Sequence, residues 1–84
     1  MEPIVITISR ARFEEKRREL LANGVNIPPT GDRGEASSSD VRVAFEFKPG
    51  SRYLGTLTLR LIGKPFFFPE SAVESRIREW FAAL

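Results

Sequence analysis

Cysteine and histidine are both absent from this chain of 84 residues. Without thiols, the protein can form no disulfide, no thiolate metal site and no cysteine nucleophile. Without imidazoles, it lacks every catalytic triad that uses histidine as the base. Metal binding by oxygen alone needs convergent carboxylates, and Asp32, Glu35 and Asp40 are spaced irregularly in a polar segment. The sequence therefore predicts no metal site and no cofactor.

The chain also has no extended apolar stretch. No apolar stretch approaches the ~20 residues that a membrane-spanning helix needs. The first residues lack the basic start, apolar stretch and small-residue cleavage site of a secretory signal. These features predict a cytoplasmic protein that does not associate with a membrane.

The chain has only a small excess of positive over negative charge. Thirteen basic residues face 11 acidic ones, a formal net charge of +2, and the pI near 9.5 overstates so small a surplus. Apolar residues make up 42% of the chain, which is enough for one modest core. We expect a single domain over residues 1–84, with marginal stability because a small domain buries a small share of its surface.

The first third of the chain predicts a strand followed by a helix. Residues 4–8 are all β-branched, and isoleucine recurs at every second position, as in a half-buried strand. Ser9 can cap a helix over residues 10–22, and Gly24 can take the positive φ that closes a helix in a Schellman motif. In that motif we expect Val25 to fold back onto Leu21.

Residues 28–40 carry no hydrophobic periodicity. Prolines, glycines and a serine run fill this stretch, which favours turns and supplies little to bury. We expect a long exposed or mobile loop here. Shortening residues 29–38 should change stability little, since loop entropy varies slowly with length.

The second half predicts a hairpin and a last helix. Residues 41–48 and 56–62 alternate apolar and polar side chains, and Pro49-Gly50 fits the centre of a type II turn between them. Gly55 indicates a bulge or a close approach by another backbone. Ser71 begins a capping box. The apolar stripe of the helix that follows consists of Val73, Ile77, Trp80, Phe81 and Leu84.

These elements predict an α+β two-layer sandwich in the order β-α-β-β-α. Both helices would cover one face of a three-stranded, mostly antiparallel sheet and leave the other face open to water. We favour the strand order 1-3-2, and the order 1-2-3 with a parallel first pair is the alternative. Many small α+β proteins share this order of elements, so the fold alone does not indicate a function.

The most distinctive feature of the sequence is a run of three phenylalanines, Phe66–Phe68, which follows Lys64 and Pro65. The candidate partner-binding residues are Lys64, Phe66, Phe67 and Phe68. In an extended segment Phe67 would point away from Phe66 and Phe68. If rings remain on the surface, the segment is a site for a protein partner or for self-association. The competing interpretation is that it wraps one end of the sandwich, with the last helix covering the third ring. An exposed sheet edge is a second route to a partner.

A cluster of cations in the first helix indicates an alternative function. It comprises Arg10, Arg12, Lys16, Arg17 and Arg18. Such a cluster could contact nucleic-acid phosphates. Interleaved glutamates leave the segment at only +2, however, so we favour a solvated helix face as its explanation. We expect the stem of Arg17 to lie along the core with its guanidinium in water.

Few residues could perform acid–base catalysis. Glu46, Tyr53, Lys64 and Glu70 would serve only if burial shifted their pKa values, and Glu46 falls on the open face. The sequence contains no phosphate-loop pattern. Gly31-Asp32-Arg33-Gly34 is not followed by the helix that a nucleic-acid clamp of this form requires. We therefore expect a non-enzymatic interaction module.

Overall fold

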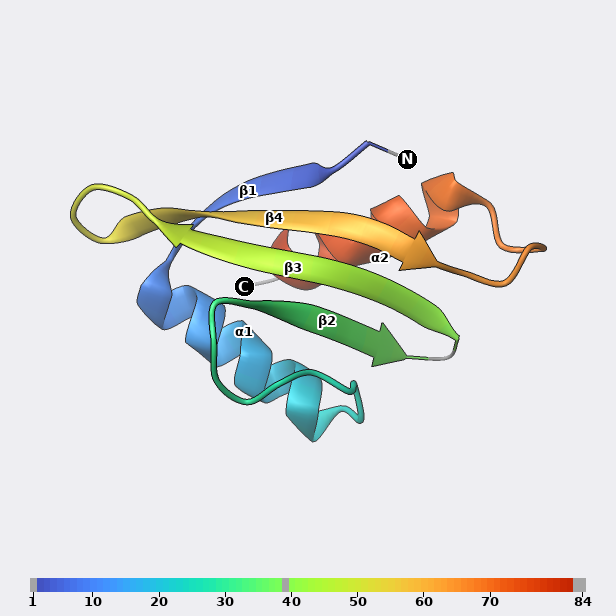
Figure 1. Cartoon of the computed structure of the whole chain (residues 1–84), viewed down its shortest axis with the longest axis horizontal. Helices are drawn as coiled ribbons and strands as arrows, with labels where there is room; N and C mark the ends of the chain where they lie inside the picture. The colour runs from blue at the N-terminus through green and yellow to red at the C-terminus, as the bar shows by residue number, and fades with distance from the viewer. Residues whose placement is uncertain (1, 39, 83–84) are drawn as a thin grey trace.

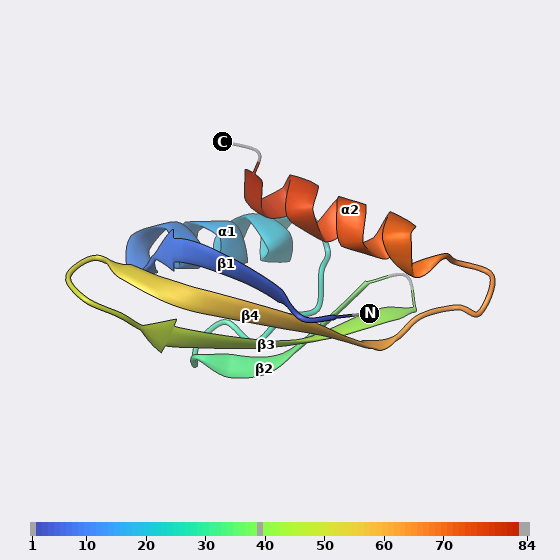
Figure 2. The same ribbon diagram turned by 90° about the horizontal axis from the view of Figure 1, so that it is seen from above.

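A computed structural model describes residues 2–38 and 40–82, and of residues 80–82 it describes the backbone alone. The elements are β1 (Ile4–Ser9), α1 (Arg10–Ala22), β2 (Arg33–Ser38), β3 (Val41–Pro49), β4 (Leu54–Gly63) and α2 (Glu70–Ala82). The four strands form one sheet (Figure 1). Both helices lie on the same side of it, as Figure 2 shows. The α+β class is thus confirmed.

The sheet differs from the predicted one in its number of strands. Its order is β1-β4-β3-β2 and every neighbouring pair is antiparallel. A sheet of three strands in the order 1-3-2 is therefore wrong in detail, and the alternative with a parallel first pair is wrong outright. The second strand of the hairpin, β4, does lie between β1 and β3.

The fourth strand, β2, arises inside the segment that we expected to be a loop. Residues 33–38 pair with β3, and Asn26 pairs with Ser37 on the other side through two backbone hydrogen bonds of 2.8 and 2.9 Å. The prediction of a loop over residues 28–40 is therefore wrong for this strand. Backbone bonds to the partner strand outweigh a sequence that offers few side chains to bury.

Helix α1 begins and ends as predicted. The Ser9 hydroxyl accepts a hydrogen bond of 3.1 Å from the Arg12 backbone N–H. At the other end Gly24 has a φ of 85°, and the Val25 N–H donates to the Leu20 carbonyl at 3.0 Å, which completes the Schellman motif. Val25 is buried with Leu20 against the core, whereas the expected partner Leu21 is exposed.

The β3–β4 turn differs from the predicted type II turn. Strand β3 runs on through Pro49, and the Gly50 N–H donates to the Leu54 carbonyl at 2.9 Å. The positive φ that we expected at Gly50 belongs to Arg52, at 59°. Gly55 does mark the close approach of another backbone, because a Cβ there would lie 2.7 Å from the Lys48 carbonyl oxygen, and it would also lie 2.5 Å from the Phe47 ring.

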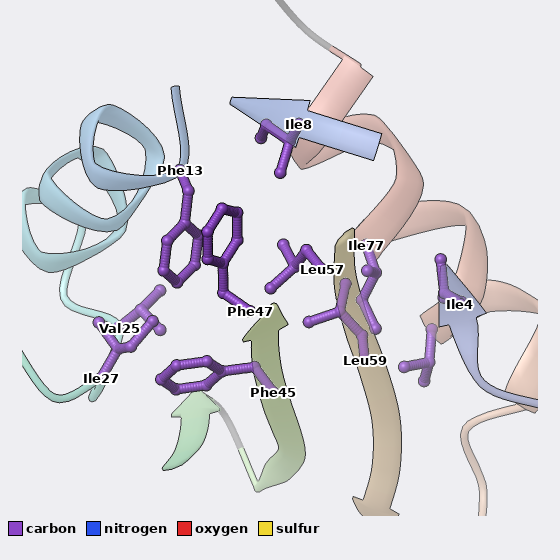
Figure 3. Close-up of a cluster of buried hydrophobic side chains, with 11 residues drawn as sticks. Ile4, Ile8, Phe13, Val25, Ile27, Phe45, Phe47, Leu57, Leu59 and Ile77 are labelled. Atoms are coloured by element: carbon purple, nitrogen blue, oxygen red, sulfur yellow. The ribbon is translucent and has the colours of Figure 1, made fainter. Parts of the chain in front are cut away.

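The core lies between the sheet and the two helices (Figure 3). Phe13 of α1 stacks on Phe47 of β3 with 5.0 Å between ring centroids, and Val73 and Ile77 anchor α2. The predicted positions further along that stripe, Trp80, Phe81 and Leu84, lie outside the described side chains. The other buried members of the core are Ile4, Ile8, Val25, Ile27, Phe45, Leu57 and Leu59.

Neither helix, within residues 2–38 and 40–82, combines the length and the apolar character required to cross a membrane.

Candidate functional site

The segment between β4 and α2, residues 64–69, is called the aromatic loop below. It extends beyond the sheet at one end of the long axis of the molecule (Figure 1). The Phe68 N–H donates to the Pro65 carbonyl at 3.0 Å, so the chain turns here. Because a turn does not alternate its side chains like a strand, the prediction that Phe67 would point away from its two neighbours is wrong.

The three rings of the aromatic loop pack on one another and remain accessible. Phe66 is 94% exposed, Phe67 is 70% exposed and Phe68 is 41% exposed. Neighbouring ring centroids lie 5.6 and 5.5 Å apart, and the first pair meets edge to face. Lys64, at the start of the loop, is half-buried. These rings form a continuous apolar surface that lies outside the core.

A cavity of about 620 Å³ lies between the two helices and the sheet. Phe13 and Leu20 of α1 line it on one side, Leu57 and Leu59 of β4 form its floor, and Ile77 of α2 lines the other side. Phe68 also belongs to its lining, so the cavity adjoins the aromatic loop.

Sequence reasoning missed this cavity because it missed β2. The core-facing positions of β2 that line the cavity are Ala36 and Ser38. Their short side chains leave unfilled the space that a larger residue on an edge strand would occupy. Small residues alternating along a strand were the available signal, but that signal has meaning only after the strand itself is known.

The predicted cation cluster of α1 is divided among separate ion pairs. Arg10 holds Asp32 through two hydrogen bonds, at 2.5 and 3.0 Å, and its guanidinium lies 4.5 Å from the centre of the Phe47 ring. The Arg10 hydrogen bond to Asp32 lowers the pKa of this carboxyl and raises that of Arg10. The Asp32 backbone carbonyl accepts from the Phe47 N–H at 2.6 Å, which fixes the carboxylate beside α1.

The other cations of α1 pair along the helix. Arg12 lies 2.7 Å from Glu15 and Lys16 lies 3.2 Å from Glu19, each one turn away. Lys16 is buried, whereas Arg18 is exposed. The five cations therefore do not gather on one accessible face.

Arg17 is only 2% exposed, so the expectation of a guanidinium in water is wrong. Its Cζ lies 4.7 Å from the centre of the Phe13 ring, and Nη1 donates to the Pro28 carbonyl at 3.1 Å. Nη2 lies 2.6 Å from Glu14 Oε1, a close contact but one without hydrogen-bond alignment, so this attraction is mainly electrostatic. Nε has no hydrogen-bond partner in the described part of the chain.

The candidate acid–base residues do not come together. The Arg33 guanidinium donates to Glu46 on the open face of the sheet and lowers the pKa of its carboxyl, so Glu46 is ionised at neutral pH. Tyr53 is 83% exposed at the β3–β4 turn, and Glu70 is exposed at the start of α2. No buried acid or base of the kind that catalysis uses is assembled from these residues.

Comparison with protein-family models, with curated proteins and with solved structures found no match.

Proposed function

We propose that this chain is a small non-enzymatic interaction module that binds a second copy of itself, or another protein, through the aromatic loop. The observation that carries the proposal is the exposure of Phe66 and Phe67, whose rings pack on each other outside the core. Contiguous exposed aromatic surface is costly in water and is typical of interaction sites. Burying these rings against a partner would recover that cost.

Light scattering over a concentration series tests self-association. Phe67→Ser removes the middle ring of the loop, and Tyr53→Ser removes an exposed ring from the turn at the opposite end of the molecule. We expect the mass of the wild type and of Tyr53→Ser to rise with concentration, and that of Phe67→Ser to stay monomeric. Equal masses in all three proteins would contradict self-association through this loop.

Site-specific photo-cross-linking tests the second occupant, another protein. A photoreactive phenylalanine analogue at position 67 should form one adduct of defined mass in a cell extract, and unlabelled wild-type protein should compete with it. The same analogue at position 53 is the control. The proposal would be refuted if the wild type stayed monomeric at every concentration and position 67 gave no adduct that unlabelled protein suppresses.

A sheet edge is the second route to the same function. The outer strands of the sheet are β1 and β2. On the outer side of β2, the backbone of Ser37 is already paired with that of Asn26. Among the residues described, β1 therefore offers the longer run of edge backbone for strand addition. Association that survives Phe67→Ser but not Val5→Pro would assign the interface to β1 instead.

Nucleic-acid binding through α1 receives less support. Four of its five predicted cations pair with carboxylates, and two of these four, Lys16 and Arg17, are buried. An electrophoretic shift titration at two salt concentrations with Arg12→Glu/Arg18→Glu tests it. A salt-dependent shift that this variant abolishes would reinstate the nucleic-acid function.

A further inference from the structure

The cavity between the helices and the sheet has the size of a small-molecule site. Its volume of about 620 Å³ lies within the roughly 300–1,000 Å³ typical of ligand pockets. Protein interiors are close-packed and rarely keep voids larger than a water molecule. Most of the walls are apolar side chains from both helices and the sheet, which hold water poorly. An apolar occupant would supply the dispersion contacts that these walls otherwise lack.

One buried hydrogen-bond donor in the wall of the cavity, the Nε–H of Arg17, has no acceptor in the described part of the chain. Arg17 lines the cavity, and its Nε–H has no acceptor although two other nitrogens of the guanidinium contact Pro28 and Glu14. Buried donors are rarely left without a partner in native proteins. An occupant with an acceptor group at this wall would satisfy Nε.

Two arginines line the cavity, one at its inner wall and one where it opens. Ala72, Arg76 and Glu79 line the cavity at i, i+4 and i+7, so they follow one side of α2, and all three are exposed. The cavity therefore reaches solvent along this helix. Its charged lining residues in the described chain are Arg17, Arg76 and Glu79. Glu14 already pairs with Arg17, so the groups that remain to attract an acceptor are the Arg17 Nε–H and the Arg76 side chain.

We propose that the cavity binds a single-chain amphiphile with a carboxylate head, of the fatty-acid class. The tail lies among the partly buried lining side chains Leu20, Val41 and Val43. The head accepts a hydrogen bond from Arg17 Nε at one wall, and Arg76 contributes charge at the opening. The cavity shares Phe68 with the aromatic loop, but this binding does not require the association proposed for Phe66 and Phe67.

A methyl NMR titration with sodium decanoate, kept below its micelle concentration, tests the proposal. Leu20, Leu57 and Ile77 line the cavity, whereas Val5 and Ile62 are exposed side chains outside it. We expect saturable shifts confined to the lining methyls, and at least tenfold weaker binding of decanol because it has no charge. Shifts that do not saturate, or that include Val5 and Ile62 equally, would overturn the site.

Two substitutions separate the cavity from the head group. Ala72→Phe should fill the opening from an exposed helix position and abolish the shifts, and Ala11→Phe adds the same ring to the exposed side of α1 as a control. Arg76→Gln should weaken decanoate three- to tenfold and leave decanol unchanged. Binding that Ala72→Phe leaves intact would disprove the cavity, and equal affinities for decanoate and decanol would disprove the carboxylate assignment.

Discussion

Two glycines of β4 differ in what surrounds them. A Cβ at Gly55 would lie 2.5 Å from the Phe47 ring and 2.7 Å from the Lys48 carbonyl oxygen, whereas a Cβ at Gly63 would meet nothing within 4 Å. Gly55→Ala should lower the free energy of unfolding by about 1–3 kcal/mol through overpacking. Gly63→Ala should leave it unchanged or raise it by up to ~1 kcal/mol. Chemical denaturation of both variants measures the difference, and equal midpoints would contradict it.

Asp32 links folding to pH at a single ion pair. Its pKa is lowered chiefly by the hydrogen bonds from Arg10, so the ionised form favours the folded state. This contribution to stability is fully present above the pKa that Asp32 has in the unfolded chain. It is lost as the pH falls through the lower pKa that Asp32 has in the folded protein. Arg10→Gln should raise the Asp32 pKa toward its ordinary value, which a carboxyl ¹³C NMR titration measures. An unchanged titration midpoint would show that this pair does not form in solution.

Arg17 marks the limit of prediction at the level of single residues. Its position beside Phe13 and Leu20 on the helix correctly placed the stem along the core. The sequence could not place its guanidinium, because the Pro28 carbonyl that it contacts belongs to a segment that shows no periodicity. Glu14, one turn away, supplies the countercharge that makes burial of this cation tolerable.

At the level of elements, local signals predicted some features and failed for others. The type II turn at Pro49-Gly50 is wrong, and so is the capping box begun by Ser71, because α2 begins at Glu70 and Ser71 lies inside it. The Ser9 cap, the Gly24 stop and the alternation in the hairpin depend on neighbouring residues, and all appear in the structure. Strand β2 has no such signal, because its stability comes from β3 and from Asn26. The aromatic loop could be located from its three phenylalanines, but its turn and its exposure depend on where β4 ends and α2 begins.

Strand β2 also reverses the expectation that residues 29–38 can be shortened freely. Ser37 uses its N–H and carbonyl toward Asn26, so Ala36 directs its own toward β3 and Glu35 directs its own outward. Ala36→Pro should therefore cost about 2–3 kcal/mol of stability, and Glu35→Pro should cost much less. Thermal unfolding of the two variants compares them directly. Equal losses would indicate that β2 does not pair with β3 in solution.

The whole molecule is small enough for one core side chain to decide whether it folds. Domains are stable by roughly 0.05–0.15 kcal/mol per residue, which for this length gives about 4–13 kcal/mol. Phe45 is buried against Phe13 and should cost about 3–5 kcal/mol when truncated to Ala. Phe67→Ser should change stability little because its ring lies outside the core. Urea denaturation tests both, and a similar loss in each would place Phe67 in the core.

Within residues 70–79, helix α2 is attached to the rest of the protein by two buried side chains. Of its side chains up to Glu79, only Val73 and Ile77 are buried. Elements with so few buried anchors open locally at a lower free energy than the global transition. Amide hydrogens in residues 70–79 of α2 should therefore exchange with deuterium ahead of those in β3 and β4. Each local opening of α2 would uncover one wall of the cavity. The rate at which a ligand enters the cavity would therefore be set by how often this helix opens.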